Sequence, residues 1–429
     1  MPAGVPPERR AAGRPADEAM IDPQPSGAAV ASERPRRPIA MLVHSYYDED
    51  PRVRREAESL VAAGYAVDVF ALRREDDAME ADVAGVNVRR LGVQRHQGAG
   101  IAVYLREYVS FLVRAGWALT RAHRRRHYGL VQVHSLPDFL AFAAVPLRLA
   151  GVPLLLDLHE AMPEFFRSRF PRASNPLFYR LLRIQERLSI RLATAVVTVN
   201  EAMVERLVGL GVHRDKVHVV VNRPSLARFD RAAQPARAFG EDASIRLVYA
   251  GALTPTYELD VALDAIGRLA ADRPDLPLVF DVYGRGDAEP GLRAQAERLG
   301  VADRVRFHGR IPIEAVPAAV ASADVGLAPT RLDRFTDVSL STKVFEYAAM
   351  GKPVVAARLP LVERTFPVGT VRTYEPGDAG SLASAIVAIA DDPDRRDAAV
   401  AATLAIVRER SWEHEAVAYI RLVEDLVRG

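Results

Sequence analysis

The chain has 429 residues, of which 49% are hydrophobic and 26% charged, and this composition is typical of a globular protein with two or more domains. A formal net charge of only +2 gives no indication of nucleic-acid binding, so we expect no nucleic-acid partner. The absence of cysteine excludes disulfides, thiolate metal sites and cysteine nucleophiles, and it fits a reducing cytoplasm.

Residues 1–37 are expected to form a disordered tail, because they are rich in Pro, Ala, Arg and Glu and hold little that a core could bury. They also lack the apolar central run of a signal peptide. No stretch reaches the roughly 18 uninterrupted apolar residues of a membrane helix. We therefore expect a cytoplasmic protein without a membrane span, able to associate with the inner face of the membrane. The nearest candidate span, residues 136–158, is interrupted by Asp138, Pro146, Arg148 and Pro153.

Residues 38–222 are predicted to form a first Rossmann-like domain. An apolar run at 39–44 is followed by a polar loop and by a helix over 51–63, which begins with a proline and is followed by Gly64. The apolar run at 66–72 completes a strand–helix–strand unit, and such a unit requires a parallel sheet. Further buried strands are predicted at 130–134, 153–158, 195–198 and 217–221.

A second Rossmann-like domain is predicted at 245–408, after a linker at 223–244 that contains Pro and Gly and few apolar runs. The segment 409–429 holds a last helix beyond the final strand, and we expect this helix to cross back to the first domain. Strands are predicted at 245–250, 278–283, 305–308, 325–328 and 353–356. Helices are predicted near 259–272, 288–299, 313–322, 341–350, 379–390 and 412–427.

These patterns predict an α/β fold of two doubly wound, Rossmann-like domains that face one another across a cleft. Ligands of open parallel sheets bind beyond the carboxyl ends of the strands. The architecture therefore predicts a site between the domains, and it does not specify the chemistry of that site.

The segment 339–355 carries the strongest local signal for a binding site. Either Ser341 or Thr342 is able to cap a helix start, where free N–H groups and the positive end of the helix dipole suit a diphosphate. Lys343 adds a full positive charge, and Glu346 is placed to accept hydrogen bonds from a ribose diol. An ordinary capped helix with a solvent-facing Lys–Glu pair fits the same residues, so both interpretations stay open at this point.

The sequence of this segment resembles the donor-site helix of glycosyltransferase family 4, whose members have the GT-B fold. The resemblance is carried by Lys343-Val344-Phe345-Glu346-Tyr347 and Gly351-Lys352-Pro353-Val354-Val355. Other segments resemble the same family in the same order, over about residues 38–425 in total. These segments begin at Arg52, Gly64, His134, Asp157, Val196, Val219, Tyr249 and Tyr283.

The resemblance implies an acceptor-side first domain and a nucleotide-sugar-binding second domain. Glu346 would hold the nucleotide ribose, with Ser341, Thr342 and Lys343 near the diphosphate. His159 would contact the donor sugar or its transferring carbon, so His159 and Glu346 are the implied catalytic residues. The alternative for His159 is an ordinary polar residue at the end of a strand, with its hydrogen bonds satisfied and no part in catalysis.

Two further residues belong to the implied donor site. Gly251 would let the backbone approach the donor phosphates closely. Arg285 would contact the nucleotide, although its Gly-Arg-Gly context is equally typical of an ordinary strand-to-helix turn. We expect no metal and no cofactor, because helix dipoles and cations stabilise the leaving diphosphate in such a site.

The sequence departs from the family pattern at three positions. Family members carry a second acid eight residues before the one that corresponds to Glu346, and this chain has Val338 there. An Arg and a Lys usually follow the glycine after the first strand of the second domain, and Ala252 and Tyr257 stand at those positions here. The candidates to supply the missing positive charge are Arg285 and Lys343.

Two basic amphipathic segments lie in the first domain. Both membrane contact and core packing are open for the first, which has an apolar arc and ends in Arg124-Arg125-Arg126. Core packing with solvated arginines is favoured for the second. The first arc comprises Tyr104, Tyr108, Phe111, Ala115 and Leu119. The second segment has Leu177, Leu181, Ile184 and Leu188 opposite Arg180, Arg183, Arg187 and Arg191.

Taken together, these features predict a retaining glycosyltransferase that uses a UDP- or GDP-sugar. Its acceptor would be a hydroxyl of a saccharide or a lipid-linked molecule, in cell-surface polysaccharide or glycolipid synthesis. The alternative is a catalytically degenerate GT-B protein that binds a nucleotide or a partner without transferring sugar. A sugar-nucleotide epimerase of the same fold ranks last, because it would need more carboxylates and histidines around the cleft.

Overall fold

The structure is a computed structural model that describes residues 36–94, 101–169, 175–235, 237–333, 336–338 and 340–429. The side chains of residues 101, 102, 168, 169 and 338 are not described either. Nearly all of the predicted tail at 1–37 therefore lies outside the described residues.

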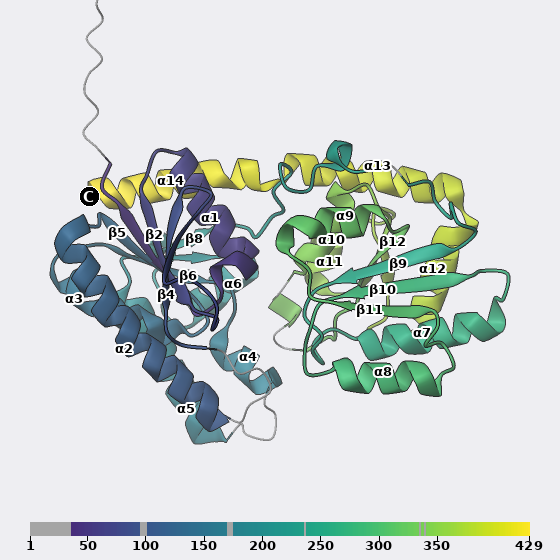
Figure 1. Cartoon of the computed structure of the whole chain (residues 1–429), viewed down its shortest axis with the longest axis horizontal. Coiled ribbons are helices and arrows are strands. Elements are labelled where there is room, and N and C mark those ends of the chain that lie inside the picture. Colours follow the sequence, from purple (N-terminus) through teal and green to yellow (C-terminus); the bar gives the residue numbers. More distant parts are fainter. Residues whose placement is uncertain (1–35, 95–100, 170–174, 236, 334–335, 339) are drawn as a thin grey trace, which may run out of the picture. The chain divides into compact units, whose positions relative to one another are not determined.

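The first half of the chain forms an eight-stranded sheet in the order β3-β4-β2-β1-β5-β6-β7-β8 (Figure 1). All neighbouring strands are parallel except β3 and β4, which form an antiparallel hairpin. The central strands are buried on both faces, which is why they appear as continuous apolar runs in the sequence. The strands are β1 (Ile39–Leu42), β2 (Val67–Leu72), β3 (Glu80–Val83), β4 (Val86–Leu91), β5 (Leu130–His134), β6 (Leu154–Leu158), β7 (Ala195–Thr198) and β8 (Val217–Val219).

The helices of this half connect the parallel strands. Two of them, α2 and α5, pack on the short 3-10 segment η2 (Asp138–Ala144). The helices are α1 (Pro51–Ala62), α2 (Ile101–Arg126), α3 (Val145–Leu149), α4 (Met162–Arg169), α5 (Pro176–Leu192) and α6 (Glu201–Gly209). The side chain of Asp50 caps the start of α1, where Pro51 holds the first position as predicted.

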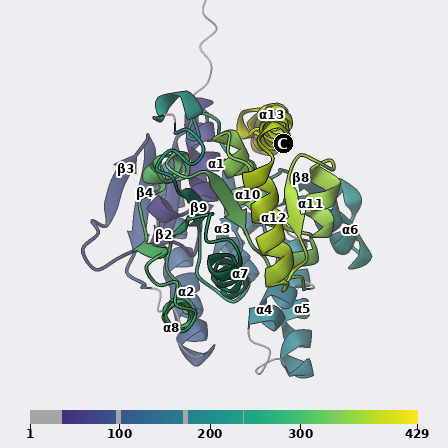
Figure 2. The same cartoon turned by 90° about the vertical axis from the view of Figure 1, so that its right-hand side faces the viewer.

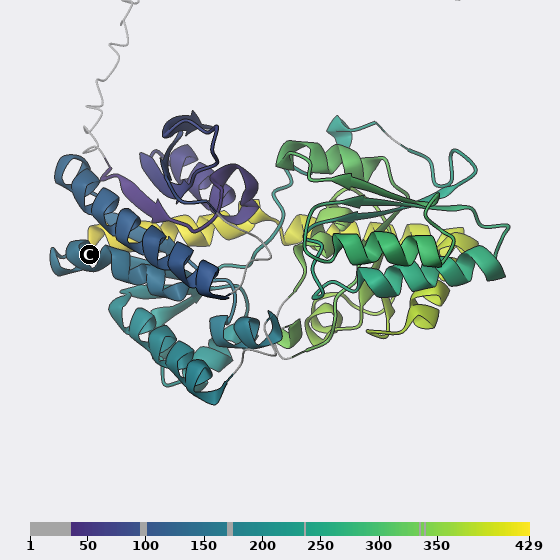
Figure 3. The ribbon, with the colours of Figure 1, turned by 60° about the horizontal axis from the view of Figure 1, so that its bottom comes forward.

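The second half forms a six-stranded, fully parallel sheet in the order β11-β10-β9-β12-β13-β14. Helices α7 and α8 lie side by side along it (Figure 3). Its strands are β9 (Ile245–Ala250), β10 (Leu278–Tyr283), β11 (Val305–Gly309), β12 (Val325–Ala328), β13 (Val354–Ala357) and β14 (Arg372–Tyr374). Its helices are α7 (Leu259–Asp272), α8 (Glu289–Arg298), α9 (Val316–Ala321), α10 (Thr342–Ala349), α11 (Pro360–Thr365), α12 (Ala379–Asp391) and α13 (Pro393–Glu409).

The last helix, α14 (Trp412–Arg428), packs against the first sheet, as the sequence predicts. Its buried side chains Trp412, Tyr419 and Val423 share a hydrophobic core with residues of β1 and α1. Two polar contacts secure it: the Trp412 indole donates to Ser59 Oγ at 2.8 Å, and the Tyr419 hydroxyl donates to Gln132 Oε1 at 2.6 Å.

The predicted α/β fold with two Rossmann-like halves is therefore confirmed. In the part of the chain that the structure describes, none of the helices combines the length and the apolar character needed to cross a membrane.

Candidate functional site

Helix α10 begins at Thr342, immediately beyond the carboxyl ends of β9 and β12. Ser341 occupies the cap position, but its hydroxyl does not cap the helix and is buried without a hydrogen-bond partner among the described residues. The Thr342 side chain bonds the carboxylate of Glu346 one turn later. The prediction that one of these side chains caps the helix is therefore wrong, and the buried Ser341 hydroxyl is left for another partner.

Lys343 is a buried cation at this helix start, with only 7% of its surface exposed. Its ammonium lies 4.0 Å from the centre of the Tyr257 ring and 5.2 Å from that of Tyr249. Within the described residues, no carboxylate comes within ion-pair distance of it. Ring faces stabilise a desolvated ammonium only partly, so the position suits an incoming anion.

Glu346 lies on the same helix and is partly exposed, unlike most of its neighbours. Burial raises the pKa of its carboxyl, against the opposing effect of the Lys343 charge and the Thr342 hydrogen bond. The structure thus brings together three of the predicted residues, Thr342, Lys343 and Glu346, on one face of α10. A solvent-facing Lys–Glu pair is excluded, because Lys343 is buried and the two side chains form no ion pair.

Gly251, the first residue after β9, lies directly against the Lys343 side chain. A Cβ at this position would overlap the end of that side chain, so a larger residue here would displace the Lys343 ammonium. Gly284 and Gly286 in the neighbouring loop pack in the same way, since a Cβ on either would overlap the carbonyl of Gly251 or Leu253. Two loops therefore meet backbone to backbone at the carboxyl ends of β9 and β10.

Arg285 lies between these two glycines and is exposed. Its Nε is the nearest atom to the site of a Cβ on Gly309, at 3.9 Å, which places the side chain at the end of β11. No ion pair holds its guanidinium among the described residues. The structure therefore places Arg285 at the same edge of the sheet as Gly251, while the role of Arg285 stays a prediction.

Tyr347 fixes α10 against the sheet. Its hydroxyl accepts a 3.0 Å hydrogen bond from the backbone N–H of Ala250, and its ring packs so closely on Gly326 that a Cβ there would overlap it. Sequence reasoning assigned Tyr347 no role. The position of Tyr347 directly after Glu346 in the motif is the sequence feature that could have indicated a role for it.

The three departures from the family pattern have different structural outcomes. Tyr257, in place of a lysine, presents its ring to the Lys343 ammonium, and the carbonyl of Ala252 accepts a 2.7 Å hydrogen bond from the Tyr249 hydroxyl. The Val338 side chain lies outside the described residues. One positive charge therefore remains beside the altered position 257, supplied by Lys343.

A second cluster of polar side chains surrounds His159 at the carboxyl ends of β5 and β6. One oxygen of Asp157, Oδ2, lies 2.7 Å from His134 Nδ1 and 2.7 Å from His159 Nε2. Glu56 on α1 lies close to both histidines and accepts a 2.6 Å hydrogen bond from the Gln132 amide. All of these side chains are almost completely buried.

Mutual electrostatics set the protonation of this cluster. Burial alone would raise the pKa of Asp157, but His159 and His134 hold it below its ordinary value. Burial lowers the pKa of His159, against the attraction of Asp157. Burial raises the pKa of Glu56 to about 8, with a further contribution from the Asp157 charge. Asp157 is thus the fixed negative charge of the cluster, and Glu56 is protonated near neutral pH.

Four of these side chains, Glu56, His134, Asp157 and His159, are of types that bind metal ions, and their nearest polar atoms all lie within 4.8 Å of one another. The two 2.7 Å distances to Asp157 are hydrogen-bond distances. Ligand atoms that lie about 2.0–2.1 Å from one tetrahedral ion would be farther from one another than these hydrogen-bond distances. The arrangement therefore fits a hydrogen-bonded network better than a ligand set.

Sequence reasoning identified His159 and missed the partners that surround it. His134 and Asp157 are opposed in the register of β5 and β6, which brings their side chains together. The available signal was a histidine at the end of one predicted strand and an Asp-x-His sequence at the end of the next. Glu56 reaches the cluster from a helix, and its position depends on how α1 packs on the sheet.

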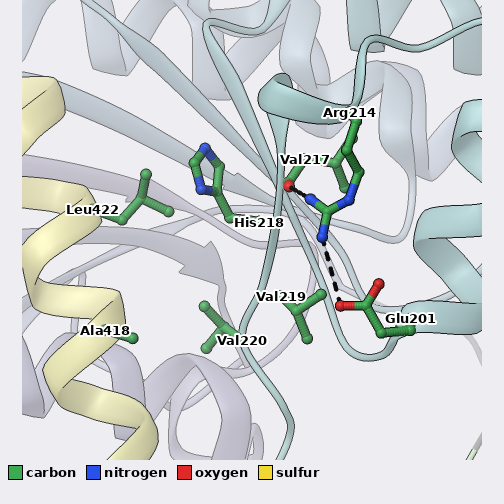
Figure 4. A pocket seen from close by; sticks show the side chains of 8 residues that line it. All are labelled: Glu201, Arg214, Val217, His218, Val219, Val220, Ala418 and Leu422. Carbon is green, nitrogen blue, oxygen red and sulfur yellow. Dashed lines mark hydrogen bonds and ion pairs between the residues drawn. The ribbon is translucent and has the colours of Figure 1, made fainter.

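A surface pocket lies elsewhere in the first half, between β8 and α14 (Figure 4). Ala418 and Leu422 of α14 line one side, and Arg214 on the other side bonds the carbonyl of Val217 at 2.7 Å. None of the predicted site residues lines this pocket, so we assign it no part in the chemistry.

The comparisons with known proteins match both halves of the chain. Residues 50–223 match the glycosyl transferase 4-like domain, and residues 244–392 match the glycosyl transferases group 1 family. The chain belongs to glycosyltransferase family 4.

Individual relatives agree with this assignment. A D-inositol 3-phosphate glycosyltransferase of Streptomyces scabiei is 29% identical to this glycosyltransferase over 92% of both chains. Sucrose-phosphate synthase of Thermosynechococcus elongatus has a TM-score of 0.73 at 19% identity, covering 91% of this chain and 99% of its own. Anabaena HepE in complex with UDP has a TM-score of 0.62 at 16% identity, covering 90% and 100%. At such identities the two structures support the GT-B fold alone.

Proposed function

We propose that this glycosyltransferase is a retaining enzyme that transfers a sugar from a nucleotide-sugar donor, a UDP- or GDP-sugar, to an acceptor hydroxyl. The acceptor is a saccharide or a lipid-linked molecule in cell-surface polysaccharide or glycolipid synthesis, and the reaction takes place in the cytoplasm. The UDP complex of Anabaena HepE supports the donor class, and the phosphatidyl-myo-inositol in the name of a Mycobacterium leprae mannosyltransferase, 34% identical over 40% of this chain, supports a lipid-linked acceptor.

One observation carries the proposal: Lys343 is a buried ammonium with aromatic rings beside it and no carboxylate partner among the described residues. A diphosphate supplies the missing negative charge, and the unpartnered Ser341 hydroxyl at the same helix start is a further donor for it. Glu346, one turn along, then accepts the hydrogen bonds of the ribose hydroxyls.

His159 is proposed to contact the donor sugar. Its Nε2–H is held by Asp157, so the neutral ring presents Nδ1 as an acceptor, and Nδ1 has no partner among the described residues. A sugar hydroxyl is a donor of the right kind for that nitrogen. The leaving diphosphate is stabilised by Lys343 and the start of α10 without a metal ion. The acceptor then attacks on the face from which the nucleotide departs.

A catalytically degenerate nucleotide-binding protein remains the second candidate, and the replacements at Ala252 and Tyr257 favour it. The two candidates differ in donor hydrolysis and transfer, since both bind the nucleotide.

The deciding experiment compares the wild type with Glu346→Ala in thermal-shift and donor-hydrolysis assays with UDP-, GDP- and dTDP-sugars. We expect one donor class to stabilise and to be hydrolysed by the wild type, with both effects lost in the variant. Stabilisation without hydrolysis would indicate the degenerate protein. If no donor stabilises the wild type, or if the variant behaves like it, the donor site is not where we place it. Addition of a chelator is expected to leave the rate unchanged.

A further inference from the structure

Helices α2 and α5 carry apolar side chains on the face that points away from the protein core. On α2 the exposed residues are Leu105, Val109, Val113 and Trp117, and on α5 they are Leu177, Leu181, Ile184 and Leu188. The four on α2 recur every fourth residue, so they form one slowly winding stripe. Trp117 and Val113 are 68% and 65% exposed, which is unusual for side chains of this size.

The first domain's own core does not account for these stripes. The arc of α2 that the sequence singled out is the opposite face, where Phe111, Ala115 and Leu119 are fully buried. On α5 the buried residues are Leu182, Glu186, Ser189 and Ile190, while Leu177, Leu181, Ile184 and Leu188 face outward. The prediction that the apolar face of α5 packs on the core is therefore wrong.

The exposed charge on both helices is exclusively basic. Glu107 is the only acidic residue of α2 and Glu186 the only one of α5, and both are buried. Of the predicted cluster 124–126, Arg126 is held by Asp68 at 2.9 Å, which leaves Arg124 and Arg125 exposed. The exposed arginines beside the two stripes are Arg106, Arg114, Arg121, Arg124 and Arg125 on α2, and Arg180, Arg187 and Arg191 on α5.

The two helices pack on a common element of the first half, and both extend beyond the sheet. Both pack on η2, and Figures 1 and 2 show both extending beyond the sheet toward the bottom of the view. Two apolar stripes bordered by arginines thus lie on two helices that share η2 as a packing partner.

We infer that α2 and α5 together form a docking surface for an anionic lipid bilayer. The leucines, Val113 and Trp117 enter the region between headgroups and acyl chains, where aromatic and aliphatic side chains are stabilised. The neighbouring arginines bind lipid phosphates, with their aliphatic stems against the apolar layer. A second copy of the chain fits this surface poorly, because it would place arginines against arginines with no acidic partner. A nucleic acid would satisfy the arginines and leave the apolar stripes in water.

The inference is tested by co-sedimentation of the full chain with phosphatidylcholine vesicles, with and without phosphatidylglycerol. We expect binding only to the anionic vesicles, weakening as salt is raised. A stripe variant with Leu105→Ser, Val113→Ser and Trp117→Ser, and a second with Leu181→Ser, Ile184→Ser and Leu188→Ser, should each bind at least about tenfold more weakly. A charge variant with Arg106→Glu, Arg121→Glu and Arg187→Glu should lose the preference for phosphatidylglycerol.

Matched controls make the same changes on the second half of the chain. They are Leu299→Ser, Leu332→Ser and Val368→Ser for the apolar set, and Arg298→Glu, Arg364→Glu and Arg395→Glu for the basic set, all at exposed positions. The controls should bind vesicles like the wild type, and circular dichroism with thermal melting checks that every variant is folded. Absence of wild-type binding, equal loss in the controls, or unchanged binding of both stripe variants would overturn the inference. So would a wild-type dimer that the stripe variants abolish while still binding vesicles.

Discussion

At the scale of single residues, the cluster around Asp157 is held by one carboxylate oxygen that serves two histidines. Both imidazoles donate to Asp157 Oδ2 at 2.7 Å, which fixes which nitrogen of each ring carries a proton. His159 is therefore presented in one tautomer and one orientation. The consequence is that Asp157 should control the function of His159 without touching the donor.

Replacement of Asp157 by Asn tests this dependence. The amide keeps the shape but removes the charge, so we expect kcat for sugar transfer to fall by at least about a hundredfold, with a smaller change in the KM for the donor. The matched control is Asp281→Asn in the second half, where Asp281 holds His308 at 2.6 Å in the same manner. Equal losses in the two variants would show that a general effect on folding, rather than the orientation of His159, is responsible.

Lys343 allows a test of the donor site that does not depend on turnover. Lys343→Met keeps most of the packing against Tyr257 and removes the charge, so UDP should bind about 10- to 100-fold more weakly. Isothermal titration with UDP measures this directly. Lys352→Met removes a nearby lysine whose ammonium donates to the Ala321 carbonyl, and it should leave UDP affinity unchanged. Unchanged UDP affinity in Lys343→Met would reject the diphosphate assignment.

Glu56 should make stability depend on pH. Its pKa is raised to about 8 in the folded chain, whereas an exposed Glu titrates near 4.3, so between these values the folded state binds a proton that the unfolded state does not. This contribution is fully present at low pH and is lost as pH rises through about 8. Denaturant unfolding at several pH values should show wild-type stability falling relative to Glu56→Gln across this window. If the difference in unfolding free energy between the two proteins is the same at every pH, the pKa of Glu56 is not raised by folding.

At the scale of elements, the contact between α10 and the second sheet depends on the absence of a side chain at Gly326. A Cβ there would overlap the Tyr347 ring, which is fully buried and whose hydroxyl is held by the backbone N–H of Ala250. We expect Gly326→Ala to lower the free energy of unfolding by about 1–3 kcal/mol and to weaken UDP binding as α10 shifts. Gly291→Ala, where a Cβ meets nothing within 4 Å, is the control in a helix of the same half.

Helices and strands were predictable from the sequence where a single signal, such as an apolar run, a starting proline or a following glycine, marked the element. The buried parallel strands, α1 with its starting proline, and α10 with its following glycine all lie close to their predicted positions. The hairpin of β3 and β4 was missed, because β3 alternates between exposed and partly exposed residues and offers no apolar run. Its turn uses Ala84 and Gly85, both with positive φ, a sequence without the usual asparagine or aspartate signal.

The faces of α2 and α5 could not be assigned from periodicity. On α2 both faces carry apolar residues, and the arc singled out from the sequence is the buried one. On α5 four apolar residues face outward while Leu182 and Ile190 are buried, so a rule that places every apolar residue inside fails there. Which face is buried depends on where η2 lies, and this is a tertiary contact. Likewise, the partners of His159 come from β5, β6 and α1, which only the strand order brings together.

At the scale of the whole molecule, α14 ties the end of the chain to the first sheet. Trp412 is 4% exposed, and its ring packs on Tyr419 and faces the Arg55 guanidinium at 4.8 Å. Trp412→Ala should cost about 3–5 kcal/mol in the free energy of unfolding, measured by denaturant titration. Trp117→Ala, at the exposed tryptophan of α2, should cost less than about 0.5 kcal/mol. Similar losses at both sites would show that α14 does not stabilise the first sheet as described.

This placement of α14 has a consequence for synthesis on the ribosome. The core beneath β1 and α1 is completed by Trp412, Tyr419 and Val423, which are translated only after the second half of the chain. The strands of the first sheet are translated early, yet that apolar face stays uncovered until the second half and α14 have left the exit tunnel. Domains usually fold in order as they emerge. In this protein the core of the first half is incomplete until α14 emerges. The nascent chain therefore exposes a hydrophobic surface throughout the synthesis of the second half, and chaperones are able to recognise such a surface.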